Sequence, residues 1–345
     1  RPAVLHFRCI FNIMDLYFSF IIPVYNRPDE IRELMQSMVE QKFSKPFEVV
    51  IIEDGSTRSS QEVVADFQSE LSITYFQKPN SGPGDSRNYG MKRAKGDYFI
   101  ILDSDCVLPP AYLRIVERSL QKEYVDCFGG PDAAHESFSL VQKAINYAMT
   151  SFLTTGGIRG SKKGLGKFQP RSFNMGISKK AFEATGGFGK IHPGEDPDLS
   201  IRLWNEGFST ALIPEAFVFH KRRIDWKRFF TQVRKFGTVR PILNQWHPRT
   251  ARTTYWFPTL FCLGLISSIV LLVLGLKLPI LLFGFYFVLI FIDSLLKNKS
   301  IAIALLSLLA VGIQFMGYGY GFLKSSILLA LTGKKPQELF PEVFF

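Results

Sequence analysis

About the first hundred residues alternate between short apolar runs and stretches in which apolar residues recur every three to four positions. The apolar runs are typical of strands covered on both faces, and the periodic stretches are typical of amphipathic helices. This alternation predicts an α/β fold with a doubly wound, mostly parallel sheet and helices on both faces. The predicted strands are Leu16–Ile22, Phe47–Ile52, Ile73–Phe76 and Tyr98–Leu102, and the predicted helices are Asp29–Gln41, Gln61–Gln68 and roughly Pro83–Ala94.

The apolar pattern changes beyond Arg252, where charged residues nearly vanish. Three apolar stretches follow one another, at Phe257–Leu276, Leu278–Ile292 and Ile301–Leu323. A helix that crosses a bilayer needs about 20 mostly apolar residues, so the first and third stretches qualify. The second, of about 15 residues, fits a tilted return span or a re-entrant segment. We expect two to three membrane helices rather than a buried helical core, because the stretches have almost no polar face.

These patterns divide the chain into five parts. We expect a disordered leader at residues 1–13, because polar and charged residues interrupt any long apolar signal sequence there. A catalytic α/β domain would follow at 14–225, then a basic juxtamembrane helical segment at 226–252, a membrane region at 253–332 and a tail at 333–345. Residues 156–166, rich in glycine and lysine, predict a loop, and 178–220 return to mixed helix and strand.

Basic residues gather just before the membrane region. The chain has a net charge of +11, and ten Lys and Arg residues between 221 and 252 face a single acid, Asp225. The positive-inside rule therefore predicts a multi-pass protein of the inner (cytoplasmic) membrane with its catalytic domain in the cytoplasm. Such a cluster also attracts anionic lipids, at about 1 kcal/mol per residue. No helix-turn-helix, zinc-finger or RNP-like pattern accompanies it, so we expect no nucleic-acid partner.

Acidic residues follow the predicted strands. Asp103 and Asp105 come directly after the strand Tyr98–Leu102, Asp54 follows Phe47–Ile52, and the pair Glu195-Asp196 stands further along. In an open α/β sheet the carboxyl ends of the strands face the ligand crevice, so these carboxylates can converge there. Paired hard oxygen ligands suit Mg²⁺ or Mn²⁺. The alternative for Asp103 and Asp105 is an ordinary surface turn.

A series of motifs then resembles the family 2 glycosyltransferases, which invert and have the GT-A fold. The motifs are, in order, Ser19-Phe20-Ile21-Ile22-Pro23-Val24-Tyr25-Asn26, Glu53-Asp54-Gly55-Ser56, Asn80-Ser81-Gly82, Ser86-Arg87-Asn88-Tyr89-Gly90, Lys95-Gly96-Asp97-Tyr98 and Leu102-Asp103-Ser104-Asp105. The resemblance covers roughly residues 16–240. The membrane tail is similar to that of bacterial members that act on lipid-linked glycans or growing polysaccharides.

The resemblance implies a role for each matched residue. Nucleotide-binding positions would be Pro23, Tyr25, Asn26, Asp54, Arg87 and Asp103, with Glu53 standing where members often have Asp. Asp105 would be the main metal ligand, Asp103 would contact ribose or metal-bound water, and His220 would complete the metal or diphosphate site. Asp196 would be the catalytic base. The donor or acceptor loops would include Glu195, Arg171, Asn174, Gln232 and Arg234. Residues 232–236 are similar to a Gln-x-x-Arg-Trp element of processive members, with Lys235-Phe236 in place of Arg-Trp.

The expected reaction explains why these residue types are needed. Negative charge grows on the leaving diphosphate, and a bound divalent cation neutralises it. A carboxylate must take the proton of the acceptor hydroxyl, which typically contributes about 10²–10⁴-fold in rate, and a single base opposite the leaving group implies inversion. The expected partners are a nucleotide-sugar donor, first of all a UDP-sugar, a lipid-linked or polysaccharide acceptor and membrane lipids. The sequence does not decide the sugar or the oligomeric state.

Several alternatives remain open at this point. A dehydrogenase is disfavoured because no Gly-x-Gly-x-x-Gly follows the first strand, and a nucleotidyltransferase because no glycine- and lysine-rich phosphate loop does. A catalytically inactive membrane-bound scaffold is disfavoured by the four aspartates. Individual residues also have structural alternatives: Asp54 in a turn, Asp196 as a helix cap before 198–204, Arg87 as a solvated residue or ion pair, and His220 as a core residue. A basic loop with Lys162, Lys163, Lys167 and Arg171 either grips an acceptor pyrophosphate or is solvated.

Overall fold

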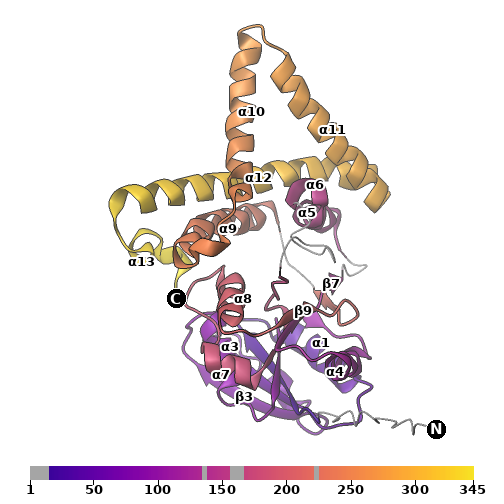
Figure 1. Cartoon of the computed structure of the whole chain (residues 1–345). Coiled ribbons are helices and arrows are strands. Elements are labelled where there is room, and N and C mark those ends of the chain that lie inside the picture. Colours follow the sequence, from indigo (N-terminus) through magenta and orange to yellow (C-terminus); the bar gives the residue numbers. More distant parts are fainter. Residues whose placement is uncertain (1–14, 134–137, 156–166, 221–224) are drawn as a thin grey trace, which may run out of the picture.

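The computed structural model describes residues 15–133, 138–155, 167–220 and 225–345. An α/β domain lies at one end of the molecule and long helices at the other, with α9 between them (Figure 1). The predicted leader at 1–13, the loop at 156–166 with Lys162 and Lys163, and the basic residues at 221–223 fall outside the described residues.

The main sheet has seven strands in the order β3-β2-β1-β4-β8-β6-β9. Strands β3, β2, β1 and β4 are parallel, whereas β8 runs antiparallel to both β4 and β6, and β9 is parallel to β6. A smaller sheet has the order β5-β10-β7. The strands are β1 Phe18–Val24, β2 Glu48–Asp54, β3 Ser72–Lys78, β4 Tyr98–Leu102, β5 Cys106–Val107, β6 Cys127–Gly129, β7 Asp132–Ala133, β8 Asn174–Ser178, β9 Thr210–Leu212 and β10 Val218–His220. The expectation of a mostly parallel α/β sheet is confirmed.

Helices cover both faces of this sheet. Those of the α/β domain are α1 Pro28–Val39, α2 Gln61–Ala65, α3 Pro83–Met91, α4 Tyr112–Lys122, α7 Lys179–Thr185 and α8 Glu195–Asn205. Alternate residues of β1 serve the two faces: Phe20 packs with α1 and α4, whereas Ile21 packs with Met91 of α3 and Leu199 of α8. Each face therefore buries its own apolar cluster, as side chains that alternate along a strand require.

The remaining helices form the membrane region and its supports. They are α5 Leu140–Thr150, α6 Phe152–Thr155, α9 Trp226–Trp246, α10 Phe257–Val273, α11 Leu278–Asn298, α12 Ile301–Thr332 and α13 Pro336–Leu339, with 3₁₀ turns at Pro248–Thr250, Thr253–Trp256 and Pro341–Val343. Among the described residues, three segments are long and apolar enough to cross a membrane: Thr253–Val273, Leu278–Asn298 and Ile301–Thr332. Helices α10 and α11 form a hairpin that rises from α12, which lies across its base (Figure 1).

Several predicted boundaries shift for identifiable reasons. β3 is longer than predicted because it pairs with β2 from Ser72 to Lys78. α11 continues past the apolar run to Asn298 because its acid is neutralised in place: Asp293 accepts hydrogen bonds from Tyr147 (2.7 Å), Ser151 (3.0 Å) and Lys297 (2.8 Å). Predictions from hydropathy alone end such a helix too early.

The tail returns to the α/β domain. The backbone N–H of Phe345 donates to the carbonyl of Lys190 (3.1 Å), and that of His192 donates to the carbonyl of Val343 (2.8 Å). Lys235 of α9 donates to the carbonyl of Glu342 at 3.0 Å. Phe340 and Val343 are buried in one apolar cluster with residues of α9. The tail thus joins the end of α12 to the loop that precedes α8.

Candidate active site

The end of β2 organises the start of α3. Asp54 is buried, and its carboxylate accepts hydrogen bonds from the Lys78 ammonium (2.6 Å) and from the backbone N–H groups of Ser81 (3.0 Å) and Gly82 (3.1 Å). Gly82 has φ +88°, a conformation that glycine adopts without strain. Asp54 therefore has the turn-stabilising role that sequence left open, whatever ligand it also contacts.

The loop after β1 lies beside the one after β2. Asn26 adopts a left-handed conformation (φ +55°), and its Oδ1 accepts hydrogen bonds from the backbone N–H groups of Thr57 (2.8 Å) and Arg58 (2.9 Å). Tyr25 stands beside it with about half of its surface exposed, 54%. Pro23 is the sixth residue of β1 rather than part of the loop. The two loops are thus fixed to each other, and Tyr25 faces solvent where a planar ring can be stacked upon.

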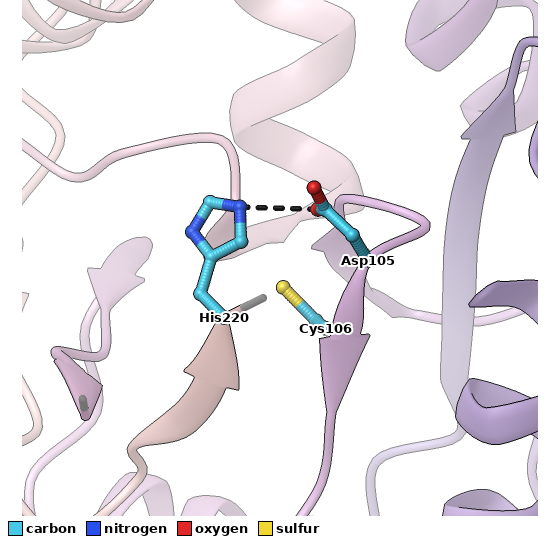
Figure 2. Close-up of side chains that lie close together, drawn as sticks. All are labelled: Asp105, Cys106 and His220. Atoms are coloured by element: carbon cyan, nitrogen blue, oxygen red, sulfur yellow. Dashed lines mark ion pairs between the residues drawn. The ribbon is translucent and has the colours of Figure 1, made fainter. Parts of the chain in front are cut away.

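A second group forms where the two sheets meet. Asp105 is buried, and one of its oxygens lies 3.0 Å from Nε2 of His220 (Figure 2). Its other oxygen pairs with the Arg27 guanidinium. Strands β5 and β10 are antiparallel, and Cys106 stands opposite His220 in their register. Burial raises the pKa of Asp105, but the hydrogen bond from His220 and the charge of Arg27 outweigh it and lower the pKa to about 2.

The same group has donor atoms suited to a cation. Within the described residues, one ligand atom each of Asp105, Cys106 and His220 lies within 4.8 Å of the others. A carboxylate oxygen with an imidazole nitrogen fits a divalent ion of the Mn²⁺ type, whereas a thiol is a soft ligand. The Cys106 thiol is itself a hydrogen-bond donor to the Phe173 carbonyl, at 3.4 Å. Asp103, predicted as a second ligand, is not in this group.

Asp103 instead faces Arg87 of α3. The guanidinium donates to Oδ1 of Asp103 (2.9 Å) and to Oε1 of Glu195 (3.4 Å), and it lies 5.3 Å from the Phe188 ring centre. The Arg87 side chain is only 4% exposed, while a third of the Asp103 side chain is exposed. The alternative of a solvated Arg87 is wrong: it is a buried cation that connects the end of β4 to the start of α8.

Asp196 lies in the first turn of α8. The helix N-cap is Gly194, and no side chain caps the helix, so the alternative of Asp196 as a simple cap is wrong. Its Oδ1 is buried without a hydrogen-bond partner, although the carboxylate receives a hydrogen bond from Ser172. Burial raises the pKa of Asp196, the charge of Glu195 raises it further, and the result is a pKa of about 6. Such a value suits a general base near neutral pH.

Glu195 is held differently from its neighbour. Nδ1 of His192 lies 2.8 Å from the Glu195 carboxylate, which also pairs with Arg87. Burial raises the pKa of Glu195, but the hydrogen bond with His192 and the charge of Arg87 outweigh it, so the pKa is lowered. The pKa of Asp196 is therefore raised, whereas that of the adjacent Glu195 is lowered. Opposite shifts of this kind are typical of two carboxyls with different roles.

The residues predicted for donor or acceptor loops are dispersed. Asn174 begins β8 and is fully buried: its Oδ1 accepts from the Tyr112 hydroxyl (2.6 Å) and its Nδ2 donates to the Ala216 carbonyl (2.8 Å). Arg171 lies close enough to Asp196 for its charge to lower that pKa. Gln232 and Arg234 stand on α9, and Oε1 of Gln232 is buried without a hydrogen-bond partner.

Four residues of the site escaped sequence reasoning: Arg27, Lys78, Cys106 and His192. Arg27 and Lys78 neutralise Asp105 and Asp54 across 78 and 24 residues of sequence, so no local pattern announces them. His192 stands three residues before Glu195, the first residue of α8. Its Nδ1 reaches the Glu195 carboxylate because the chain turns into the helix at Gly194. For Arg27 the sequence did offer an indication of a place in the site, because this residue comes directly after the loop that ends at Asn26.

Part of the chain is similar to known proteins. Residues 19–186 match the family described as Glycosyl transferase family 2. An uncharacterized glycosyltransferase of Rickettsia conorii is 45% identical over 91 residues, 26% of this chain and 15% of that protein. The poly(ribitol-phosphate) beta-N-acetylglucosaminyltransferase TarS of Staphylococcus aureus is 36% identical over 112 residues, 32% of this chain and 20% of TarS. The matched segment thus spans only a small part of these relatives.

A solved structure extends the similarity to most of the chain. A mannosyltransferase of Pyrobaculum calidifontis, solved in complex with GDP-Man and Mn²⁺, superposes with a TM-score of 0.54 at 15% identity, covering 93% of this chain and 88% of that one. At this identity the similarity concerns the fold. Residues 19–186 therefore form a domain of the family described as Glycosyl transferase family 2.

Proposed function

We propose that this protein transfers a sugar from a nucleotide-sugar donor to a hydroxyl of a glycan acceptor, with inversion at the anomeric carbon. The observation that carries the proposal is the partly buried Asp196, which has one buried oxygen without a hydrogen-bond partner and a pKa of about 6, beside the Arg87 bridge to Asp103. Relatives named as glycosyltransferases and a neighbour that holds GDP-Man support it.

The donor end would be built from residues at the tips of β1, β2 and β4. Tyr25 offers an exposed ring for the base, and Asp103 has exposed carboxylate surface for a ribose hydroxyl. Asp54 acts by fixing the N–H groups of Ser81 and Gly82. Arg87 keeps Asp103 in place and adds positive charge near the predicted diphosphate. A UDP-sugar is the first donor to test and GDP-mannose the second.

Asp105 and His220 would hold a divalent cation, Mg²⁺ or Mn²⁺. A bound cation of this kind neutralises the charge that grows on a departing diphosphate. The chain prepares the site in advance, because His220 and Arg27 keep the Asp105 carboxylate ionised at neutral pH. Asp103 then serves the nucleotide rather than the cation, since its carboxylate pairs with Arg87.

Asp196 would accept the proton of the acceptor hydroxyl. With a pKa of about 6 it is mostly ionised at pH 7 and is a stronger base than an ordinary aspartate. Glu195 is unsuited to this role because His192 and Arg87 stabilise its ionised form. One base on the side of the sugar away from the leaving group gives inversion.

The acceptor would be a lipid-linked glycan or a surface polysaccharide, reached from the cytoplasmic side of the inner membrane. Arg171, near Asp196, and Gln232 and Arg234 on α9 are the residues we assign to acceptor contacts. The three apolar helices beside the catalytic domain support a membrane-bound acceptor. Lys235, which stands where processive members have Arg, donates a hydrogen bond to the tail carbonyl of Glu342.

The test is release of nucleoside diphosphate by the full chain in lipid nanodiscs with Mn²⁺, screened over a panel of nucleotide sugars. We expect one donor to be hydrolysed slowly without acceptor, and the Asp196→Asn variant to lose turnover by about 10²–10⁴-fold while it keeps its affinity for the nucleotide. Asp66→Asn, which changes an exposed aspartate paired with Arg32, is the matched control. Nucleotide binding without hydrolysis of any donor would instead favour the inactive scaffold.

A further inference from the structure

The contacts of the tail restrict how the chain can thread a bilayer. Hydrogen bonds join Phe345 and Val343 to Lys190 and His192 of the α/β domain, and Glu342 to Lys235 of α9. The segments before α10 and after α12 therefore lie on the same side of any membrane. An even number of crossings must separate them, although three helices are apolar enough to cross.

The packing of α12 identifies the helix that does not cross. Its middle is buried against α9, where a Cβ on Gly317 would lie 2.6 Å from Val233 and one on Gly321 would lie 2.3 Å from the Arg234 carbonyl. Ala310 and Val311 of α12 share a buried cluster with Ile145 of α5. In an 18-residue apolar segment of α12, 39% of the residues are buried inside the protein. In the corresponding segments of α10 and α11, 11% are buried.

Crossing by α12 would carry α9 into the bilayer with it. Helix α9 contains Lys227, Arg228, Arg234, Lys235 and Arg240, and each charge at the bilayer centre costs about 2.5–3.5 kcal/mol on insertion scales. Helix α10 contains no charged residue, and α11 contains only the hydrogen-bonded pair Asp293 and Lys297, near its end. The two helices rise together on the opposite side of α12 from α9 (Figure 1). A two-crossing arrangement through α10 and α11 satisfies both constraints.

The exposed surface of α12 has the pattern of a helix lying flat. Its exposed large apolar residues fall on one stripe of about 120°, at 100° per residue. They are Ile301, Leu305, Leu309, Met316, Tyr320, Ile327 and Leu331. Exposed Lys324 stands at the edge of this stripe, where its ammonium can reach the headgroups. With 32 residues the helix is about 48 Å long, more than the roughly 30 Å of a hydrocarbon core.

We propose that the chain crosses the bilayer twice, through α10 and α11, and that α12 lies in the plane of the membrane interface on the side of the catalytic domain. Its exposed apolar stripe is buried among lipid acyl chains, and its opposite face carries α9 and α5. The occupant of the stripe is the lipid bilayer, because the stripe is continuous with the base of the α10–α11 hairpin, where Gly319 of α12 packs against Pro258 of α10.

The first experiment counts the crossings by labelling with a membrane-impermeant maleimide in sealed vesicles that hold the full chain in one orientation. Single cysteines are placed at exposed Lys179 in the α/β domain, Leu276 between α10 and α11, and Lys334 after α12, with Cys9 and Cys262 changed to serine. Cys106 and Cys127 are buried and stay. We expect Lys179→Cys and Lys334→Cys to be labelled from one side and Leu276→Cys from the other.

Labelling of Lys334→Cys and Leu276→Cys from the same side, opposite to Lys179→Cys, would show an odd number of crossings and overturn the proposal. Labelling of all three from one side would overturn it too, because the hairpin would not cross. Retention of nucleotide binding in each variant shows that the chain is folded.

The second experiment measures depth with nitroxide labels on cysteines at Leu305, Met316 and Ile327 of α12, and at Leu281, Val288 and Leu296 of α11 as the crossing control. We expect equal depths along α12 and a steady change of depth along α11. A steady change along α12 would contradict the flat orientation. Spin–spin broadening at the α12 positions, with no contact with lipid, would show that a second copy of the chain covers the stripe.

Discussion

Asp105 and Asp196 are two aspartates of the candidate site whose pKa values the protein shifts in opposite directions; Asp105 is buried and Asp196 is partly buried. Burial alone raises the pKa of both. Asp105 accepts a hydrogen bond from His220 and pairs with the Arg27 guanidinium, and its pKa falls to about 2. Asp196 has the Glu195 carboxylate beside it and one oxygen without a hydrogen-bond partner, and its pKa rises to about 6. The difference shows that neighbouring charges, rather than burial, set the opposite pKa values that the two proposed roles require.

The largest effect should come from removing the charge of Asp105. In Asp105→Asn we expect the Mn²⁺-dependent part of nucleoside diphosphate affinity to fall by about 100-fold, because His220 alone is a poor site for a cation. Calorimetry with and without Mn²⁺ measures it. Cys106→Ser is the matched control, since the thiol beside Asp105 is engaged with the Phe173 carbonyl. Equal Mn²⁺ dependence in Asp105→Asn and in the unsubstituted protein would remove Asp105 from the cation site.

Replacing Asp196 should raise the stability of the fold, although it should lower the activity. Its pKa is raised in the folded state, so the stability it contributes is present below the unfolded pKa of about 4 and is lost as pH rises through about 6. Asp196→Asn should therefore stabilise the fold by of order 2 kcal/mol at pH 8 and change it little at pH 4. Thermal unfolding in detergent at both pH values tests this. A lower Tm at pH 8 would show that the charged form is well solvated.

The pH profile offers a third comparison. If Asp196 is the base, kcat/KM should fall about tenfold per pH unit below pH 6, where the carboxyl is protonated, and level off above it. Rates measured from pH 4.5 to 8 at saturating Mn²⁺ give the profile. A flat profile down to pH 5 would contradict the assignment of the raised pKa to the catalytic group.

The smallest effect isolates the contribution of Glu195. Glu195→Gln keeps the shape but removes the negative charge that raises the pKa of Asp196, so the acid limb of the profile should move to lower pH. The plateau above pH 7 should change less than the position of the limb. Glu183→Gln, on neighbouring α7 and exposed, serves as the control. A limb that does not move would mean that burial alone sets the acidity of Asp196.

The positions of the strands and of the acidic residues at their ends could be predicted from the sequence, because each depends on a short contiguous segment. The strand Tyr98–Leu102 is as predicted, and the acids that follow β2 and β4 are at the expected edge of the sheet. The helix that carries Asp196 begins three residues earlier than the predicted 198–204, because Gly194 with φ +126° starts it. The family and the fold follow from such motifs, since each is a short contiguous segment.

What could not be predicted are the partners that tune those acids. Arg27 meets Asp105 only after the sheet has placed β1 beside β4, and Lys78 meets Asp54 only after it has placed β3 beside β2. The separation of Asp103 from the cation ligands depends on where Arg87 of α3 comes to lie. These contacts are products of topology, and a pKa depends on them more than on the residue itself.

Arg87 gives the two ends of the reaction a common counter-charge. Its guanidinium is shared between Asp103 at the proposed donor end and Glu195 next to the proposed base, and it is itself almost fully buried. A ligand that breaks the contact between Asp103 and Arg87 would let the guanidinium pair more closely with Glu195. The negative charge of Glu195 would then be better compensated, so it would raise the pKa of Asp196 less and make Asp196 a weaker base. Occupancy at one end is thereby thermodynamically linked to proton affinity at the other, and the linkage must act equally in both directions.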